Sequence, residues 1–384
     1  MDINKAIYQD PTSVPLWKET RQMSLDYFEG IYKRVGSNFD RLFFESEVEA
    51  KGRQLVIDAV EKGIFIWDKD GSIYFPGEKI GLNNCVFVTR ENYATYEGKD
   101  VALEHFEYEV FPYDLDIHVV ANEQKNFFEI AFAALEQLFP YQKGKQYHLA
   151  YGMVNLKSGK ISSRTGQVIT ADWLIDEAKG KIKEIIQLSN KPINQLSNKY
   201  ERDREEEIAE KVAIAAVKYS MLKVNPKQDI AFDLEESVSL EGDSGPYLLY
   251  TYARGRSVIR RAESTLSAFP RRLPKSPRLL REINKEEREI LRLLARFEEV
   301  VAEAAIGLSP NVVASYLFKL AQAYNLFYEK HSILRITNYE LRIKKKEDRQ
   351  NINIKNFRVF LTEATAEILK KGLYLLGIET VERM

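Results

Sequence analysis

The sequence predicts an α/β layer with a partly parallel sheet, followed by a domain built from helices. Short apolar, β-branched runs alternate with helix-like segments in the first half of the 384-residue chain, which is typical of a sheet covered by helices. Residues 188–204 are polar and rich in breakers, as expected of a linker, and helical spacing dominates beyond them. A chain of this length is expected to form two or more domains.

The elements of the first half follow from local patterns. A helix is expected over roughly 15–35, because Trp17, Met23 and Phe28 lie at helical spacings and Gly36 follows. The Asp-Gly pair in IFIWDKDGSIYF predicts a hairpin. Further along, the patterns predict strands in CVFVTR and DIHVVA, a helix in NFFEIAFAALEQLF, a buried strand in HLAYGMVNL, and a helix with a Thr170 cap in ITADWLIDEAKGKIKEIIQL.

Two long helices are expected in the second half. Residues 310–328 begin with Pro310, which suits a first helical turn, and their expected apolar face comprises Val313, Leu317, Leu320, Tyr324 and Phe327. RVFLTEATAEILKK predicts a last helix that stops at Gly372, and ELRIKKKEDRQNINIKN before it is expected to be a loop. The aromatic residues of this half are expected in the core instead of stacking on bases: Tyr316, Tyr324, Phe327 and Tyr328.

Composition narrows the class of protein. A hydrophobic fraction of 45% and a charged fraction of 29% are typical of a soluble globular protein. No run approaches the ~18 apolar residues of a membrane helix, and the N-terminus lacks the apolar core of a signal peptide. A single cysteine, Cys85, excludes an internal disulfide framework and a cysteine-built zinc site. We therefore expect a cytoplasmic protein without membrane contact and without a metal site.

Charge is unevenly distributed although the net charge is −1. Residues 201–210 are acidic, whereas one stretch holds nine basic residues and one acid, Glu263. The nine are Arg254, Arg256, Arg260, Arg261, Arg271, Arg272, Lys275, Arg278 and Arg281. Such clustering is the electrostatic footprint of a phosphate backbone, and a solvated helix face is an equally open interpretation.

A polar, glycine-containing loop carries the sharpest local signal for chemistry. It runs Gly159-Lys160-Ile161-Ser162-Ser163-Arg164-Thr165-Gly166, between an expected strand and an expected capped helix. Its lysine, hydroxyls and backbone amides can close over a triphosphate and neutralise charge as pyrophosphate leaves. Because the lysine precedes the helix by about ten residues, the loop is not of the Walker type. Taken alone, it is more often an ordinary surface turn.

Four motifs in order resemble those of arginyl-tRNA synthetases, and the match covers almost the whole chain. YGMVNLKSGKISSRTGQVITADWLIDEA resembles the family's KMSKS region, Thr95–Asp100 its Tyr-x-x-x-Asp segment, and 119–124 its V-x-x-E-Q run. Residues 241–254 resemble its G-x-x-G-P-Y-x-x-Y-x-x-A-R signature. The C-terminal helices, down to Glu382-Arg383-Met384, resemble its DALR-type anticodon-binding domain.

The resemblance implies a fold and a function. Residues 1–190 would be an α/β remainder of a class I synthetase nucleotide-binding, Rossmann-like domain, 191–250 a linker with connecting helices, and 251–384 a DALR-like all-α bundle. The implied reaction is that of an arginine–tRNA ligase, which adenylates arginine with ATP and transfers it to tRNA-Arg. L-arginine, tRNA-Arg and an ATP–Mg²⁺ substrate complex are the implied partners, with no tightly bound cofactor.

The resemblance also assigns roles to residues. Tyr96, Asp100 and Gln124 would line the arginine pocket; a carboxylate accepts two donors of a guanidinium, and a spacing of four places Tyr96 and Asp100 on one helix face. A surface tyrosine and a capping aspartate are the alternative. Lys160, Ser162 and Ser163 would be catalytic through the ATP phosphates, with Gly159, Arg164 and His148 nearby, although His148 is equally expected as a packed strand residue. The residues implied to contact tRNA are Tyr247, Tyr250, Arg254, Arg256, Arg260 and Arg261.

Three departures from the family limit the expected activity. The loop lacks the second lysine of KMSKS, and Phe127 stands where members commonly have a histidine. No HIGH-like tetrapeptide occurs, and the parent is expected to be longer by roughly 200 residues, one typical domain. Loss of one transition-state donor costs roughly 10²–10³ in rate, so we expect this chain to bind nothing tightly and to activate no arginine alone.

Three alternatives stay open at this point. The chain could be one half of a split synthetase whose N-terminal half carries the HIGH motif, or a catalytically inactive tRNA-binding fragment. A protein-binding scaffold has only the acidic run at 201–210 in its favour.

Overall fold

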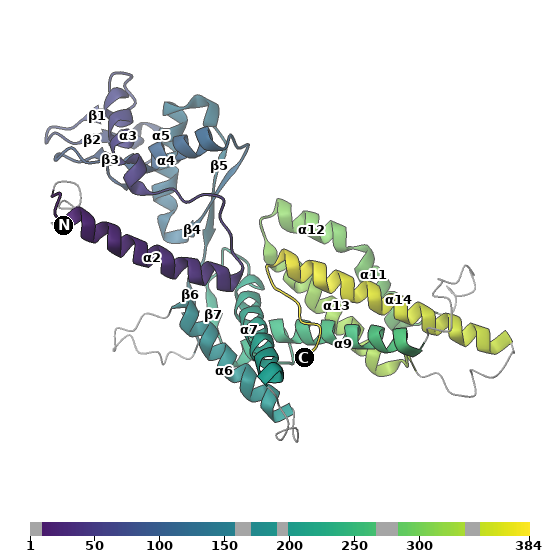
Figure 1. The fold of residues 1–384 in the computed structure, drawn as a ribbon. Helices are drawn as coiled ribbons and strands as arrows, with labels where there is room; N and C mark the ends of the chain where they lie inside the picture. The colour runs from purple at the N-terminus through teal and green to yellow at the C-terminus, as the bar shows by residue number, and fades with distance from the viewer. Residues whose placement is uncertain (1–9, 158–169, 190–198, 266–282, 335–345) are drawn as a thin grey trace. The chain divides into compact units, whose positions relative to one another are not determined.

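The computed structural model describes residues 10–157, 170–189, 199–265, 283–334 and 346–384 (Figure 1). The chain forms two compact units. The α/β unit comprises Phe39–Val154 with Pro226–Ile230. The helical unit comprises Met1–Asn38, Asn155–Asn225 and Ala231–Met384.

The α/β unit contains a three-stranded antiparallel sheet and a separate pair of parallel strands, so the expected parallel pairing is confirmed for one pair only. Phe65, Phe75 and Phe87 form the centre of its core, where they pack against the helices. The elements in chain order are α3 (Glu45–Asp58), β1 (Ile66–Trp67), β2 (Ile73–Phe75), η1 (Gly77–Ile80), β3 (Cys85–Val88), α4 (Tyr96–Val110), β4 (Asp116–Ala121), η2 (Asn122–Gln124), α5 (Lys125–Leu138), η3 (Pro140–Gln142) and β5 (Gln146–Tyr151).

The predicted hairpin is confirmed, and one predicted strand is wrong. β1 and β2 pair antiparallel around a turn in which Gly71 has a φ of 88°, a conformation that favours glycine. The expected buried strand at 148–156 is instead split into β5 and β6 (Val154–Leu156), and both are largely exposed or half-buried. The break falls at Gly152, where a Cβ would lie 2.2 Å from the carbonyl oxygen of Gln228.

The helical unit consists of long helices and one short strand that pairs with β6. The predicted apolar faces are confirmed, because Leu174, Ala178 and Ile182 of α6 are buried, as are Leu317 and Phe327 of α13. Within the described residues, none of the helices is both long and apolar enough to cross a membrane. Its elements are α2 (Ser13–Val35), α6 (Ala171–Ser189), α7 (Lys199–Leu222), β7 (Ile230–Phe232), α8 (Leu234–Val238), α9 (Gly245–Thr265), α11 (Lys285–Ala295), α12 (Phe297–Ile306), α13 (Pro310–Lys330) and α14 (Lys346–Leu375).

Two expectations about the C-terminal helix are wrong. Helix α14 already begins at Lys346, so much of the segment expected to be a loop is helical. The helix does not stop at Gly372, because α14 continues to Leu375. A Cβ at position 372 would come within 2.4 Å of the Leu317 side chain. The left-handed glycine after the helix is Gly377, with a φ of 67°. The close contact with α13 explains why a glycine occurs within a helix.

The polar segment at 188–204 is only partly described. Helix α6 extends to Ser189 and α7 begins at Lys199, so both ends of the expected linker are helical. Residues 190–198 lie outside the described part of the chain.

The predicted N-terminal helix is confirmed as α2, and Arg34 near its end joins three helices. Its Nε lies 2.6 Å from Oε1 of Glu210 on α7, and its Nη2 lies 2.5 Å from Oδ1 of Asp176 on α6. Glu210 also binds Lys179 at 2.8 Å. The acidic run on α7 therefore forms ion pairs within the unit, which removes the one feature that favoured a protein-binding scaffold.

Candidate functional site

Helix α4 is fixed in the α/β unit by contacts of its first turn. Thr95 caps the helix: its Oγ1 accepts from the amide of Gly98 at 3.3 Å and donates to the carbonyl of Val86 at 2.8 Å. A Cβ on Gly98 would lie 2.2 Å from the carbonyl oxygen of Phe87, and one on Gly52 would lie 2.1 Å from that of Gly98. The backbones of α3, α4 and β3 are therefore in direct contact, which fixes the position of the first turns of α4 and so of Tyr96 and Asp100.

Tyr96 and Asp100 lie one turn apart on α4, as the spacing predicts. Tyr96 is 70% exposed. Asp100 is not a cap, because Thr95 is, so the capping alternative is excluded. The Oδ2 atom of Asp100 is buried and has no hydrogen-bond partner among the described residues. An exposed aromatic ring thus lies one helical turn before a carboxylate oxygen that has no hydrogen-bond partner in the described part of the chain.

Negative charge accumulates along this face of α4. Burial raises the pKa of Asp100 to about 7, and the charges of Glu97 and Asp116 add to the effect. Burial together with Asp116 and Asp100 raises the pKa of Glu107 to about 7. The pKa of Glu104 is raised well above its usual range, again mainly by burial. Such a face favours a bound cation, because a positive charge stabilises the ionised carboxylates.

The other expected pocket residues in this unit lie elsewhere. Gln124 ends η2 and is exposed, and no hydrogen bond joins it to Tyr96 or Asp100 in the described part of the chain. The Nε2 of His148 on β5 lies 3.0 Å from the carbonyl of Val120, to which it donates, and its ring packs on Phe128 at 4.4 Å. This arrangement is typical of a packed strand residue, and a role of His148 in ATP binding stays a prediction.

The expected phosphate loop cannot be placed. Gly159, Lys160, Ser162, Ser163 and Arg164 lie outside the described residues. The chain enters the loop after Lys157, whose amide donates to the carbonyl of Phe232 at 2.9 Å, and the described chain resumes at Thr170, just before α6.

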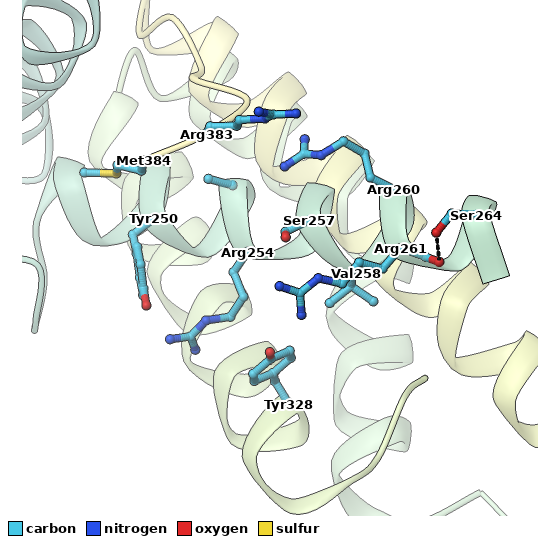
Figure 2. A pocket seen from close by; sticks show the side chains of 11 residues that line it. Tyr250, Arg254, Ser257, Val258, Arg260, Arg261, Ser264, Tyr328, Arg383 and Met384 are labelled. Atoms are coloured by element: carbon cyan, nitrogen blue, oxygen red, sulfur yellow. Dashed lines mark hydrogen bonds between the residues drawn. The ribbon is translucent and has the colours of Figure 1, made fainter. Parts of the chain in front are cut away.

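In the helical unit, Arg254 of α9 is held by uncharged groups (Figure 2). Its Nη1 donates to Oδ1 of Asn325 at 2.7 Å. Its guanidinium carbon lies 4.7 Å from the centroid of the Tyr250 ring and 5.0 Å from that of Tyr328, distances at which cation–π attraction operates. An open pocket of about 570 Å³ adjoins it. The pocket is lined by Tyr250, Ala253, Arg254, Ser257, Val258, Arg260, Arg261, Ser264, Tyr328, Arg383 and Met384.

The basic residues of α9 have two different roles. Arg256 and Arg260 bind the carboxylate of Glu382 near the C-terminus, with nitrogen–oxygen distances of 2.9 and 3.4 Å. Tyr252 donates to the same carboxylate at 2.7 Å. Tyr247 accepts from Nδ2 of Asn325 at 2.9 Å. Arg256, Arg260 and Tyr247 therefore stabilise the unit, and their assignment to tRNA contact stays a prediction.

Sequence reasoning missed several residues of this pocket. Tyr316, Tyr324 and Phe327 are buried as expected, but Tyr328 is 38% exposed and holds Arg254, so its assignment to the core is wrong. Asn325, which holds Arg254 without lining this pocket, was also missed, although its position three residues before Tyr328 places the two on one face of α13. Arg271, Arg272, Lys275, Arg278 and Arg281 of the basic run lie outside the described residues.

An α/β unit with an acidic helix face, followed by a helical unit with a basic pocket, has the organisation of a class I aminoacyl-tRNA synthetase. Family comparison agrees: residues 8–234 match the family described as "tRNA synthetases class I (R), catalytic domain", and residues 248–384 match the "DALR anticodon binding domain".

Curated relatives specify the family further. The arginine–tRNA ligase of Porphyromonas gingivalis is 35% identical over 378 residues, which cover 98% of this chain and 59% of that protein. The arginine–tRNA ligase of Bacteroides thetaiotaomicron is 32% identical over 376 residues, with coverages of 98% and 59%. The chain belongs to the arginyl-tRNA synthetase family, and it spans about three-fifths of the length of these relatives.

Solved structures share the fold, which confirms the predicted fold class. The arginyl-tRNA synthetase of Plasmodium falciparum aligns with a TM-score of 0.74 at 18% identity, covering 99% of this chain and 60% of that one. That of Thermus thermophilus aligns with a TM-score of 0.69 at 24% identity, covering 98% and 68%. A methionyl-tRNA synthetase of Mycobacterium tuberculosis aligns with a TM-score of 0.59 at 11% identity, covering 92% and 77%.

Proposed function

We propose that this chain supplies the arginine pocket and the tRNA-binding surface of an arginine–tRNA ligase. The ligase adenylates arginine with ATP and Mg²⁺, and then transfers it to tRNA-Arg. The observation that carries the proposal is the buried, unpartnered Oδ2 of Asp100 one helical turn from exposed Tyr96. Membership of the arginyl-tRNA synthetase family supports it.

A guanidinium fits the surroundings of Asp100. It is planar, stays charged at all physiological pH values, and offers two parallel donors to a single carboxylate. Its charge would compensate the negative charge that Asp100 shares with Glu97 and Asp116. A neutral isostere such as citrulline would leave Asp100 buried without a counter-charge, so the pocket should discriminate strongly against it.

The pocket beside Arg254 fits the tRNA. Arg254 is held by Asn325 and two tyrosine rings, none of which is charged, so its positive charge stays available to an anion. Arg261 and Arg383 line the same pocket. Phosphates bind to such arginines, and unstacked bases pack on exposed tyrosine rings like that of Tyr250.

Arginine-dependent ATP–pyrophosphate exchange in the presence of tRNA-Arg tests the ligase function. We would measure it for the chain alone and together with the N-terminal part of the Porphyromonas gingivalis relative, which would supply the HIGH motif. We expect no exchange by the chain alone and arginine-specific exchange by the pair, lost on Asp100→Asn. Exchange that is unaffected by Asp100→Asn would contradict the assignment of Asp100.

The second candidate is a tRNA-binding protein without catalysis, favoured by the way Arg254 is held ready in the helical unit. Fluorescence anisotropy with tRNA-Arg and a non-cognate tRNA at two salt concentrations separates the candidates. Preference for tRNA-Arg without exchange by the pair would support the second candidate. Weak, salt-sensitive binding without preference would mean that the arginines form only an electrostatic surface.

A further inference from the structure

A second cluster lies one turn beyond Asp100 in the α/β unit, where Glu104 of α4 meets Asp116 and His118 of β4. Asp116 and His118 are two residues apart on the strand, so their side chains point to the same face. The Nε2 of His118 lies 3.4 Å from Oε1 of Glu104 and 3.7 Å from Oδ2 of Asp116. One donor atom from each of the three residues lies within 4.8 Å of the others.

Of the three residues, Glu104 is the most deeply buried and has a carboxylate oxygen without a hydrogen-bond partner among the described residues. The residue is 2% exposed, and its Oε2 has no hydrogen-bond partner in the described part of the chain. No lysine or arginine of the described residues forms an ion pair with Glu104 or Asp116. The nearby Lys145 is engaged by the hydroxyl of Tyr108 and the carbonyl of Tyr113. A carboxylate buried this deeply is costly in its ionised form, and either protonation or a bound cation relieves that cost.

The distances fit metal ligands better than hydrogen bonds. A charge-assisted hydrogen bond between these atoms would measure about 2.7–2.9 Å. Tetrahedral zinc, with bonds of about 2.0–2.2 Å, holds neighbouring ligand atoms about 3.3–3.6 Å apart. The observed 3.4 and 3.7 Å fall at or next to that range.

We propose that Glu104, Asp116 and His118 bind a Zn²⁺ ion. An imidazole nitrogen with two carboxylates suits zinc, whereas Mg²⁺ prefers an all-oxygen octahedron and keeps its water. The sequence predicted no metal site, because the three ligands come from two elements and follow no recognised ligand spacing. None of its three ligands is proposed to contact arginine or ATP, although the charge of Asp116 also acts on Asp100, so zinc binding can be tested without ligase activity.

Zinc binding must break the hydrogen bond between His118 and Gln146 of β5. Its Oε1 lies 2.7 Å from Nε2 of His118, whose N–H donates to it, while its Nε2 donates to the hydroxyl of Tyr113 at 2.8 Å. When Nε2 of His118 gives its lone pair to the metal, its proton resides on Nδ1 and the bond to Gln146 is lost. The freed Oε1 of Gln146, or a water, then completes a four-ligand site.

Isothermal titration of metal-stripped chain with Zn²⁺ tests the proposal. We expect one Zn²⁺ per chain, with binding that millimolar Mg²⁺ does not displace, and X-ray absorption showing only nitrogen and oxygen ligands. Glu104→Gln and His118→Gln should each lower the affinity at least about 10-fold. Glu109→Gln, on the same helix with a 58% exposed side chain, is the matched control and should leave the affinity unchanged.

Other outcomes would overturn the proposal. They are no Zn²⁺ binding by the folded chain, Zn²⁺ binding that Glu104→Gln leaves unchanged, or displacement by Mg²⁺ at equal concentration. Glu104→Gln keeps the size of the side chain and removes a buried charge, so it is expected to fold. A melting curve recorded by circular dichroism checks this.

Discussion

The two units differ in how their buried carboxylates are paired. In the helical unit, carboxylates are paired with cations: Glu287 with Arg358 at 2.7 Å, Glu210 with Arg34 at 2.6 Å, and Glu382 with Arg256 at 2.9 Å. In the α/β unit, Asp100, Glu104 and Glu107 of α4 form no ion pair with lysine or arginine among the described residues. Burial raises the pKa of all three.

The difference separates charged side chains that form ion pairs within the fold from those that we propose to bind a ligand. An ionised buried carboxylate without a partner costs stability, and protonation or a bound cation relieves this cost. In the helical unit, the described groups that contact the guanidinium of Arg254 are all uncharged: Asn325, Tyr250 and Tyr328. Among the described residues, Asp100 in the α/β unit and Arg254 in the helical unit thus carry charges without an oppositely charged partner, and we propose arginine and tRNA as their respective ligands.

The largest expected effect comes from breaking an ion pair that holds the fold. Arg358→Ala leaves Glu287, which is 2% exposed, buried without its partner, and should lower the free energy of unfolding by about 3–5 kcal/mol. Urea unfolding measures the loss. Arg292→Ala, whose side chain is 71% exposed and pairs with Glu289, is the control and should change stability by less than about 0.5 kcal/mol. Equal effects of the two variants would contradict the distinction.

A substitution at Asp100, which we propose to bind arginine, should raise the free energy of unfolding instead of lowering it. At pH 8 and without ligand, Asp100→Asn removes a buried negative charge and should stabilise the α/β unit by roughly 1–2 kcal/mol. Hydrogen exchange of the amides of α4 reports this unit separately. The exposed neighbour Asp114→Asn serves as the control and should have no effect. A destabilised Asp100→Asn variant would show that Asp100 is a structural residue.

Substitutions of the basic residues of α9 should likewise fall into two classes, one that weakens tRNA binding and one that lowers stability. Arg254→Gln removes the charge that is held ready for an anion, and should weaken tRNA binding roughly 10-fold, about 1.4 kcal/mol. Arg256→Gln breaks the bond to Glu382 and should alter stability more than tRNA affinity. Anisotropy titrations and melting curves of both variants make the comparison. A greater loss of tRNA affinity in Arg256→Gln would reverse the assignment.

The smallest expected effect is on the pH dependence of stability, which should differ in sign between the two units. Asp100 and Glu107 have raised pKa values of about 7, so they destabilise the folded state at pH 8 and lose this effect as the pH falls towards 5. Each group contributes less than about 1.4 kcal/mol per pH unit. Lys330, the backbone and His331 lower the pKa of Glu286 to about 2, so its contribution is lost only below about pH 4.5.

Hydrogen exchange between pH 8 and pH 5 measures both trends. Protection of the ligand-free α/β unit should rise as the pH falls, whereas that of helix α11 should hold until more acid conditions. Parallel loss of protection in both units would contradict the contrast.

Local sequence patterns predicted most helices and strands. They missed the features that depend on contacts between residues distant in sequence. The spacing of Tyr96 and Asp100 gave their common helix face, and the periodicity of α13 gave its buried side. Gly152 and Gly372 were misjudged because each accommodates a neighbour, Gln228 or Leu317, that is distant in sequence. The cluster of Glu104, Asp116 and His118 was missed for the same reason, since a helix and a strand must pack before it exists.

The most direct test of the account is a titration with L-arginine and with L-citrulline, followed by ligand-observed NMR, which detects weak binding. We expect the chain to bind arginine in preference to citrulline at pH 8, and Asp100→Asn to abolish the preference while Asp114→Asn retains it. Equal binding of the two amino acids, or a preference that survives Asp100→Asn, would contradict the claim that α4 keeps its uncompensated carboxylate for the guanidinium of arginine.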